Sequence, residues 1–221
     1  MFLHFRIKGS EFFAGASYLL LDTSSEFSIS GVDPSFKSNT RDAAVIFHLD
    51  YDSRNTIFTP TDGISASISA SLFREAVGSD TEFEKYKAKI YYFTPISDSF
   101  VLGLRGDVQT IDGDPNEIPF YMYPFVSLWG IPVMRYQGET VGLAEAELGW
   151  NLTSRWSVLG FAGAGRTGSS LSDLSSAKSR SAYGVGFRYL MARRLGLRVG
   201  LDVAQGPEDT YAYLIVGTAW R

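Results

Sequence analysis

The chain has 221 residues, 45% of them apolar and 14% aromatic, and its 20 basic and 24 acidic residues give a net charge of −4. This composition excludes a disordered chain, and the slight excess of acid disfavours nucleic-acid binding. The absence of cysteine excludes disulfides, thiolate catalysis and cysteine-ligated zinc. The only two histidines are His4 and His48, so neither a multi-histidine metal centre nor a histidine relay is expected.

The apolar residues are spread along the chain. The longest apolar run, residues 12–21, is about half of the roughly 18 residues that a membrane-spanning helix needs. The residues after Met1, FLHFRIKGSEFF, do not read as a secretory leader, which indicates an internal start or a leader already removed. A glycine- and aromatic-rich chain of this kind fits a soluble all-β protein or a closed membrane β-barrel.

Alternation of apolar and polar residues dominates the chain and predicts an all-β fold. It begins weakly at 11–22 and 41–51 and is clearest at 64–72, where five apolar residues alternate with four serines. Further strands are predicted at about 85–92, 99–109, 141–150, 156–165, 183–189, 195–203 and 210–220. The total is about ten antiparallel strands of roughly 9 to 12 residues, a length typical of tilted transmembrane strands.

The predicted connections alternate in length. Long polar links occur at about 23–40, 74–83, 111–139 and 166–180, with shorter links between them at about 52–62, 94–98, 151–155 and 192–194. A short link at 205–209 is the exception. Long loops at one end and short turns at the other are typical of an outer-membrane barrel.

The two faces of the predicted strands differ in chemistry. The apolar face carries aromatic residues toward the strand ends, as in a lipid-facing girdle: Tyr86, Tyr92, Phe100, Trp150, Trp156 and Trp220. The other face interleaves both signs of charge and is expected to line the lumen: Lys85, Lys87, Lys89, Arg105, Asp107, Glu145, Glu147, Arg188, Arg198 and Asp202. The alternative is a soluble barrel or sandwich with its apolar face inward.

Residues 51–63 (YDSRNTIFTPTDG) join two predicted strands and resemble a turn motif of the BamA/TamA outer-membrane superfamily, the bacterial surface-antigen barrels. Pro60 and Gly63 are expected to shape a tight turn, and the side chains of Asp52, Arg54 and Asn55 to hydrogen-bond its backbone. The resemblance implies that this turn is periplasmic.

Residues 118–139 resemble the long extracellular loop that folds back into the lumen in that superfamily. Its hallmark is an arginine in an aliphatic-Arg-Gly-aromatic tetrad. Met134 and Arg135 match, whereas Tyr136 stands where glycine is usual. The resemblance implies a lumenal loop anchor formed by Arg135, Tyr136, Gln137 and Gly138.

Residues 144–167 and 197–206 are similar to the strands that follow this loop. In the superfamily an aspartate in a Phe-x-Asp-x-Gly strand pairs with the loop arginine, but Gly163 occupies that position here. Glu145 or Glu147, on the preceding predicted strand, is therefore expected to be the partner of Arg135.

The resemblance covers nearly the whole chain and implies an antiparallel transmembrane β-barrel. Five strands follow the loop, as in the superfamily, whereas about eleven precede it in a barrel of sixteen. Residues 1–221 are therefore expected to be the C-terminal part of a barrel domain that lacks about six N-terminal strands. A self-contained ten-strand barrel is the alternative.

The resemblance also implies function: an integral protein of the bacterial outer membrane that aids insertion or translocation of proteins or lipids. The implied partners are outer-membrane lipid and, further, unfolded outer-membrane proteins or periplasmic factors. One alternative is a passive pore or structural surface antigen. Another is a barrel that anchors an upstream patatin-like lipase domain, which the encoded sequence before Met1 would reveal.

Other motifs do not predict chemistry. The G-x-G-x-x-G at 163–168 is followed by a polar loop instead of the helix that dinucleotide binding needs. Asp112, Asp114 and Asn116 have calcium-loop spacing without the completing glycine and glutamate. His48 lies mid-strand on the charged face and is expected to line the lumen. No catalytic residue, cofactor or metal is therefore expected.

Overall fold

The computed structural model describes residues 2–29 and 32–217. Eleven antiparallel strands form one sheet in sequence order. They are β1 (Phe2–Arg6), β2 (Phe12–Ile29), β3 (Val32–Asp52), β4 (Gly63–Phe73), β5 (Phe83–Pro95), β6 (Phe100–Gly113), β7 (Thr140–Asn151), β8 (Trp156–Gly168), β9 (Arg180–Ala192), β10 (Leu197–Gln205) and β11 (Thr210–Val216). The prediction of an all-β antiparallel fold is confirmed.

Helical structure in the described part of the chain is confined to three single turns: η1 (Glu75–Val77), η2 (Phe120–Met122) and η3 (Asp173–Ser175). Among these residues no helix has the length and apolarity needed to cross a bilayer.

Two features at the N-terminal side differ from the prediction. Phe2–Arg6 forms an additional strand, because its residues pair in register with 13–17 of β2. The predicted long link at 23–40 is largely strand, since β2 and β3 continue their ladder through Phe27 and Phe36. Each strand supplies the other with backbone partners, so the polar ribbon needs no further contacts to satisfy these groups.

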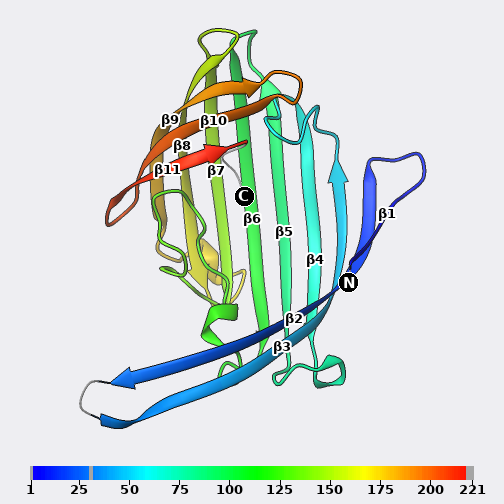
Figure 1. The fold of residues 1–221 in the computed structure, drawn as a ribbon, viewed down its shortest axis with the longest axis vertical. Helices are drawn as coiled ribbons and strands as arrows, with labels where there is room; N and C mark the ends of the chain where they lie inside the picture. Colours follow the sequence, from blue (N-terminus) through cyan, green and yellow to red (C-terminus); the bar gives the residue numbers. More distant parts are fainter. Residues whose placement is uncertain (1, 30–31, 218–221) are drawn as a thin grey trace.

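The sheet is strongly curved (Figure 1). Strands β4 to β8 run side by side, β9 to β11 bend over in front of them, and the β2–β3 ribbon sweeps across the lower end. The turns 53–62, 96–99 and 152–155 lie at the upper end, here called the short-turn end. The connections 74–82, 114–139 and 169–179 leave from the opposite, long-loop end.

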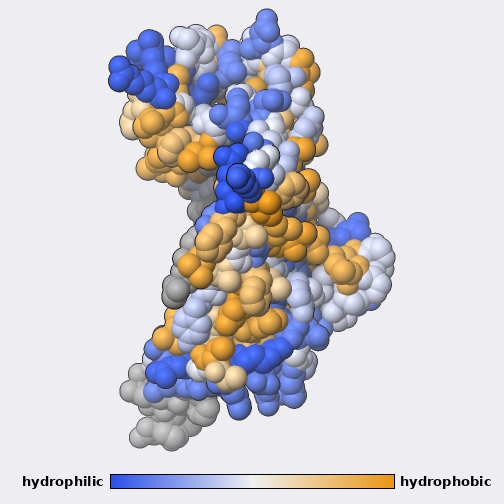
Figure 2. Space-filling view, turned by 90° about the vertical axis from the view of Figure 1, so that its right-hand side faces the viewer, coloured by the Kyte–Doolittle hydropathy of each residue, from blue (hydrophilic) through white to orange (hydrophobic). Residues whose placement is uncertain are grey.

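The convex face is apolar and exposed. Ile68 on β4 is 62% exposed and Val185 on β9 is 66% exposed. Hydrophobic side chains also form patches over the middle of the face seen in Figure 2, interrupted by a hydrophilic group. Phe100 stacks on Trp150 with ring centroids 5.7 Å apart, and Trp156 packs against Tyr189, all near the short-turn end. Phe100, Trp150 and Trp156 belong to the predicted aromatic girdle, and two further members, Tyr86 and Tyr92, are each 40% exposed. The remaining predicted member, Trp220, lies outside the described residues.

The concave face holds the buried groups. Its polar members are Asp42, Arg105, Asp107, Glu145, Ser157, Arg188 and Asp202. The apolar core also lies on this side, between the sheet and the connection 114–139, here called the inner loop. These charged residues of the strands therefore lie on the concave face of the sheet.

Candidate functional site

The inner loop, residues 114–139, covers the concave face of the sheet, here called the wall. Its residues alternate in burial as those of a strand do. Met122, Pro124, Val126, Leu128 and Gly130 are buried, while the residues between them are half-buried. The loop doubles back after Gly130: Phe125 pairs with Gln137, and the amide of Gly138 donates to Pro124 O at 3.1 Å. This fold-back satisfies backbone groups that the wall does not reach.

Three apolar clusters seat the loop on the wall. Ile118 and Met122 pack with Phe73, Phe83 and Ile111 near the long-loop end. Val126, Leu128 and Ile131 pack with the wall residues Val141, Leu143 and Ala182. Trp129 packs on the cluster of Leu159, Phe161 and Ala204, and its ring meets that of Tyr213 edge-on at 4.2 Å.

Glycines on β8 make room for the second cluster. A Cβ at Gly165 would lie 2.5 Å from Val126 Cγ1, and one at Gly163 would lie 2.9 Å from Leu128 Cδ2. Gly163 is the position at which the resembled superfamily carries its aspartate, so here a leucine packs where a carboxylate would stand. The absence of the aspartate at position 163 therefore accompanies a loop that packs on β8 through apolar side chains.

A buried charge network lies beneath the loop. Arg105 on β6 has Nη2 3.4 Å from Asp107 Oδ2 and Nη1 3.3 Å from Glu145 Oε2. It also donates to the carbonyl oxygen of Ser127 at 3.1 Å and to its Oγ at 2.9 Å. Lys89 Nζ lies 3.7 Å from Asp107. One guanidinium therefore joins two wall carboxylates to the loop backbone.

Arg135 lies at the exposed side of the loop and pairs with Glu208 of the β10–β11 turn. Its Nη2 is 2.7 Å from Glu208 Oε1, and the Tyr136 hydroxyl donates to the same oxygen at 2.9 Å. Hydrogen bonding to Glu208 raises the pKa of Arg135, and the Arg135 guanidinium, followed by Tyr136, lowers the pKa of Glu208. Met134, just before Arg135, has a φ of 62° that turns the chain here.

The prediction that Glu145 or Glu147 partners Arg135 is therefore wrong. Glu145 faces Arg105 on the neighbouring strand, because β6 and β7 pair these two positions directly. Gln137 donates from Nε2 to Phe120 O at 2.8 Å, inside the loop. Gly138 lies close to the end of β8, where a Cβ at residue 138 would be 3.1 Å from Gly168 O.

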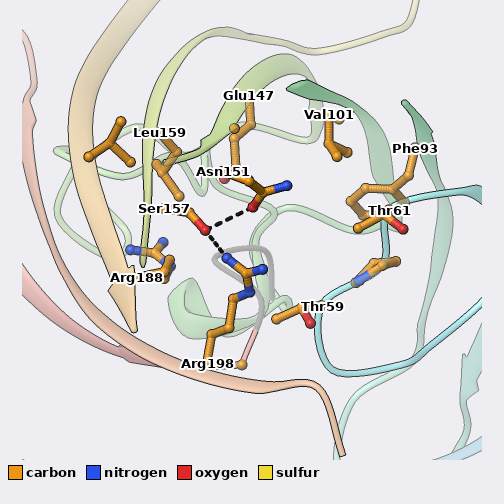
Figure 3. Close-up of a pocket in the computed structure, with 15 residues that line it drawn as sticks. Thr59, Thr61, Phe93, Val101, Glu147, Asn151, Ser157, Leu159, Arg188 and Arg198 are labelled. Carbon is orange, nitrogen blue, oxygen red and sulfur yellow. Dashed lines mark hydrogen bonds between the residues drawn. The ribbon is translucent and has the colours of Figure 1, made fainter. Parts of the chain in front are cut away.

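Glu147 lines a separate cavity of about 120 Å³ at the short-turn end (Figure 3). Arg188 and Arg198 reach into the same space, and Arg188 forms a paired hydrogen bond with Asp202. Arg198 donates to Ser157, which donates to Asn151 at 2.9 Å. Thr59, Pro60 and Thr61 of turn 53–62 close this cavity.

The side chains of Asp52 and Asn55 hydrogen-bond the backbone of turn 53–62, as predicted: the Arg54 amide donates to Asp52 Oδ1 and the Thr61 amide to Asn55 Oδ1, both at 3.1 Å. The Arg54 side chain, expected to bond the backbone too, donates instead to the Asp52 carboxylate, with Nε at 2.9 Å and Nη2 at 2.7 Å, which raises the pKa of Arg54. Gly63 has a φ of 106°, and a Cβ there would lie 2.5 Å from Ser53 O.

This turn also reaches across the short-turn end. Pro60 is buried, and Thr59 Oγ1 donates to Gly196 O, in the β9–β10 turn, at 2.6 Å. The motif therefore ties together two turns that are 137 positions apart in sequence.

Comparison with known proteins identifies the sheet. Residues 15–123 match the model of the Omp85 superfamily domain. About half of the chain, from residue 15 to residue 123, is therefore similar to an Omp85 superfamily domain. Its fold is similar to the crystal structure of BamA from Haemophilus ducreyi lacking POTRA domains 1–3, with a TM-score of 0.65 and 16% sequence identity. The resemblance to the BamA/TamA superfamily is confirmed.

That alignment covers 92% of this chain and 51% of the BamA chain, so the present sheet spans about half the length of its structural relative. No curated protein matches the sequence.

Sequence reasoning had indicated the inner loop, the turn and the β8 glycines that make room for the loop, but it missed three residues of this site. Arg105 had been placed in the lumen without a role, and Ser127 and Glu208 had not been singled out. The spacing of Arg105 and Asp107 on one strand face, opposite Glu145 in the next strand, was the available signal for the buried network.

Proposed function

We propose that this Omp85-type barrel aids the insertion or translocation of outer-membrane proteins or lipids in the bacterial outer membrane. The observation that carries the proposal is the seating of the inner loop on the concave wall. A passive pore needs a continuous polar lumen, whereas here buried apolar side chains of the loop, such as Val126 and Leu128, are packed on the wall.

The exposed apolar belt supports a partner role for outer-membrane lipid. Unfolded outer-membrane proteins fit as the cargo, since their strands alternate in the same way and can add to a sheet edge through backbone hydrogen bonds. Periplasmic factors would meet the short-turn end, where turns 53–62 and 193–196 are joined. The proposal assigns the chain no covalent chemistry.

The proposal is tested with the full chain in lipid vesicles. A urea-unfolded outer-membrane barrel protein is added, and its folding is followed by heat-modifiable gel migration. Faster folding than in vesicles holding an unrelated barrel protein supports the proposal, and an unchanged rate with every cargo tested, protein or lipid, contradicts it.

Conductance separates the pore alternative. The proposal predicts low conductance in planar bilayers, because the loop occupies the lumen. A large, steady conductance would favour a passive pore. A catalytic domain encoded upstream of Met1 would favour the lipase-anchor alternative.

A further inference from the structure

The two histidines of the chain meet on the lumenal wall, although 44 positions separate His4 from His48. They lie on β1 and β3, and both pair with Gly15 of the intervening strand β2. Asp50, two residues along β3, points to the same place. His4 Nε2 is 3.7 Å and His48 Nε2 is 3.9 Å from Asp50 Oδ2.

Gly15 is the reason that side chains from non-adjacent strands converge. A Cβ at this position would overlap His48 Nε2 and the carbonyl oxygen of Leu3. Neighbouring strands lie about 4.8 Å apart, so β1 and β3 are separated by roughly twice that distance. The imidazole of His48 crosses this gap by lying directly over the glycine, and its ring centroid is 5.4 Å from that of His4.

The donor set is that of a transition-metal site. Two imidazole nitrogens and one carboxylate oxygen lie within 4.8 Å of one another. In a tetrahedral zinc site with bonds of about 2.0 to 2.2 Å, two ligand atoms are roughly 3.3 to 3.6 Å apart. The two distances to Asp50, 3.7 and 3.9 Å, need to contract by a few tenths of an ångström, and the two imidazole nitrogens, which lie within 4.8 Å of each other, must also come to this separation.

The site is reachable and electrostatically suitable. The side chains of His4 and Asp50 are 36% and 33% exposed, whereas that of His48 is 12% exposed. The group is thus open to ions on one side and held by the wall on the other. Arg6, on the same face of β1, is paired with Glu11 at 3.3 Å.

We propose that His4, His48 and Asp50 bind one divalent transition-metal ion, for which zinc is the best match. Nitrogen-rich sites of this kind prefer zinc, copper or nickel over calcium and magnesium, and the three ligands leave one coordination position to water. The ion would join β1 to β3 across β2 and so fasten the N-terminal edge of the described sheet.

The test uses the full chain, folded in detergent and free of a polyhistidine tag. Zinc binding is measured by calorimetric titration, and cobalt is added separately to detect the visible absorption of a tetrahedral site. We expect one ion per chain, and a loss of affinity of at least about tenfold in H48Q and D50N. D98N, which changes an exposed carboxylate in the 96–99 turn, is the matched control and should bind as the parent chain does.

A second measurement needs no variant. Since the chain has two histidines only, peptide mass mapping after treatment with diethyl pyrocarbonate reports the modification of each imidazole separately. Saturating zinc should protect both, and removing the metal with a chelator should restore the reaction. Absence of saturable binding to the parent chain, equal binding by H48Q and D50N, or unchanged modification in zinc would overturn the proposal.

Discussion

Arg105 on β6 and Glu145 on β7 face one another in the barrel wall, with Nη1 3.3 Å from Oε2, and Ser127 of the inner loop is bound to the same guanidinium. Both side chains are almost completely buried, at 7% and 5% exposure for the two residues. A charge pair within the wall thus fixes the place of a loop that follows β6 in the chain. The loop also meets polar groups of the wall elsewhere, since Tyr121 donates to Asp42 at 2.6 Å and the Gly130 amide donates to the Tyr213 hydroxyl at 3.0 Å.

Replacing Arg105 with methionine should destabilise the fold by about 3 to 5 kcal/mol, because the buried Glu145 loses this cation and Asp107 keeps only Lys89, 3.7 Å away, of the two cations near it. Urea unfolding of the detergent-solubilised chain measures the change. R194M, which alters an exposed arginine of the 193–196 turn, should stay within about 0.5 kcal/mol of the parent chain. An equally small effect of R105M would contradict the role of Arg105.

Replacing Arg135 with alanine should expose the loop locally while leaving global stability nearly unchanged. The Arg135–Glu208 pair is exposed, and solvent screening leaves such pairs little effect on global stability. We expect faster protease cleavage within residues 132–138 in R135A and in E208Q. The double variant should be cleaved no faster than the worse single variant, since both remove the same contact. Unchanged cleavage and folded yield in R135A would remove the anchor hypothesis.

The same pair predicts a pH dependence. The pKa of Glu208 is lowered in the folded chain, chiefly by hydrogen bonding to Arg135. The contribution of the pair is therefore fully present above the ordinary glutamate pKa of about 4.3 and is lost as the pH falls through the lowered folded value. Carbon-13 NMR of the Glu208 carboxyl should give a pKa below the ordinary value that returns to it in R135A. Identical titrations of the two proteins would argue against the pairing.

Gly165→Ala should displace the inner loop, because the added Cβ would lie 2.5 Å from Val126 Cγ1. Overpacking of this kind costs about 1 to 3 kcal/mol. Adding V126A removes the colliding methyls and should restore part of the stability. G149A is the matched control, since the nearest atom to its Cβ would be Val101 O at 3.8 Å. Thermal unfolding midpoints of the four proteins give the comparison, and a G165A midpoint equal to that of G149A would count against this packing.

Local sequence patterns predicted the strands and turns better than they predicted contacts between residues far apart in the sequence. Alternation located the ten predicted strands because lipid and lumen impose opposite chemistry on successive residues. The turn motif also predicted the backbone hydrogen bond to the Asp52 carboxylate, since its donor, the Arg54 amide, is only two positions away. The link at 23–40 was misread because its polar residues pair with each other in a ribbon, which composition does not distinguish from a loop.

The partners of the inner loop depend on how the sheet curves. Arg135 meets Glu208, 73 positions away and on a connection four strands further along the sheet. Glu145 was predicted to be the partner of Arg135 because it lies on the charged face, but the register of β6 and β7 places it directly opposite Arg105. The meeting of His4 and His48 likewise depends on β1, which the alternation had not revealed, and on the space left by Gly15.

The most direct test of the central claim, that the inner loop lies against the lumenal wall, is a disulfide between V126C and G165C. The chain has no cysteine of its own, and the Val126 Cβ lies 3.3 Å from the position of a Cβ at residue 165, close to the separation of about 3.5 to 4.5 Å in disulfides.

Mild oxidation of the folded, membrane-embedded chain should leave no free thiol in V126C/G165C. The control variant V133C/G165C should keep two free thiols after the same oxidation, because Val133 is 67% exposed. Two free thiols in folded V126C/G165C after oxidation would contradict a loop seated in the lumen.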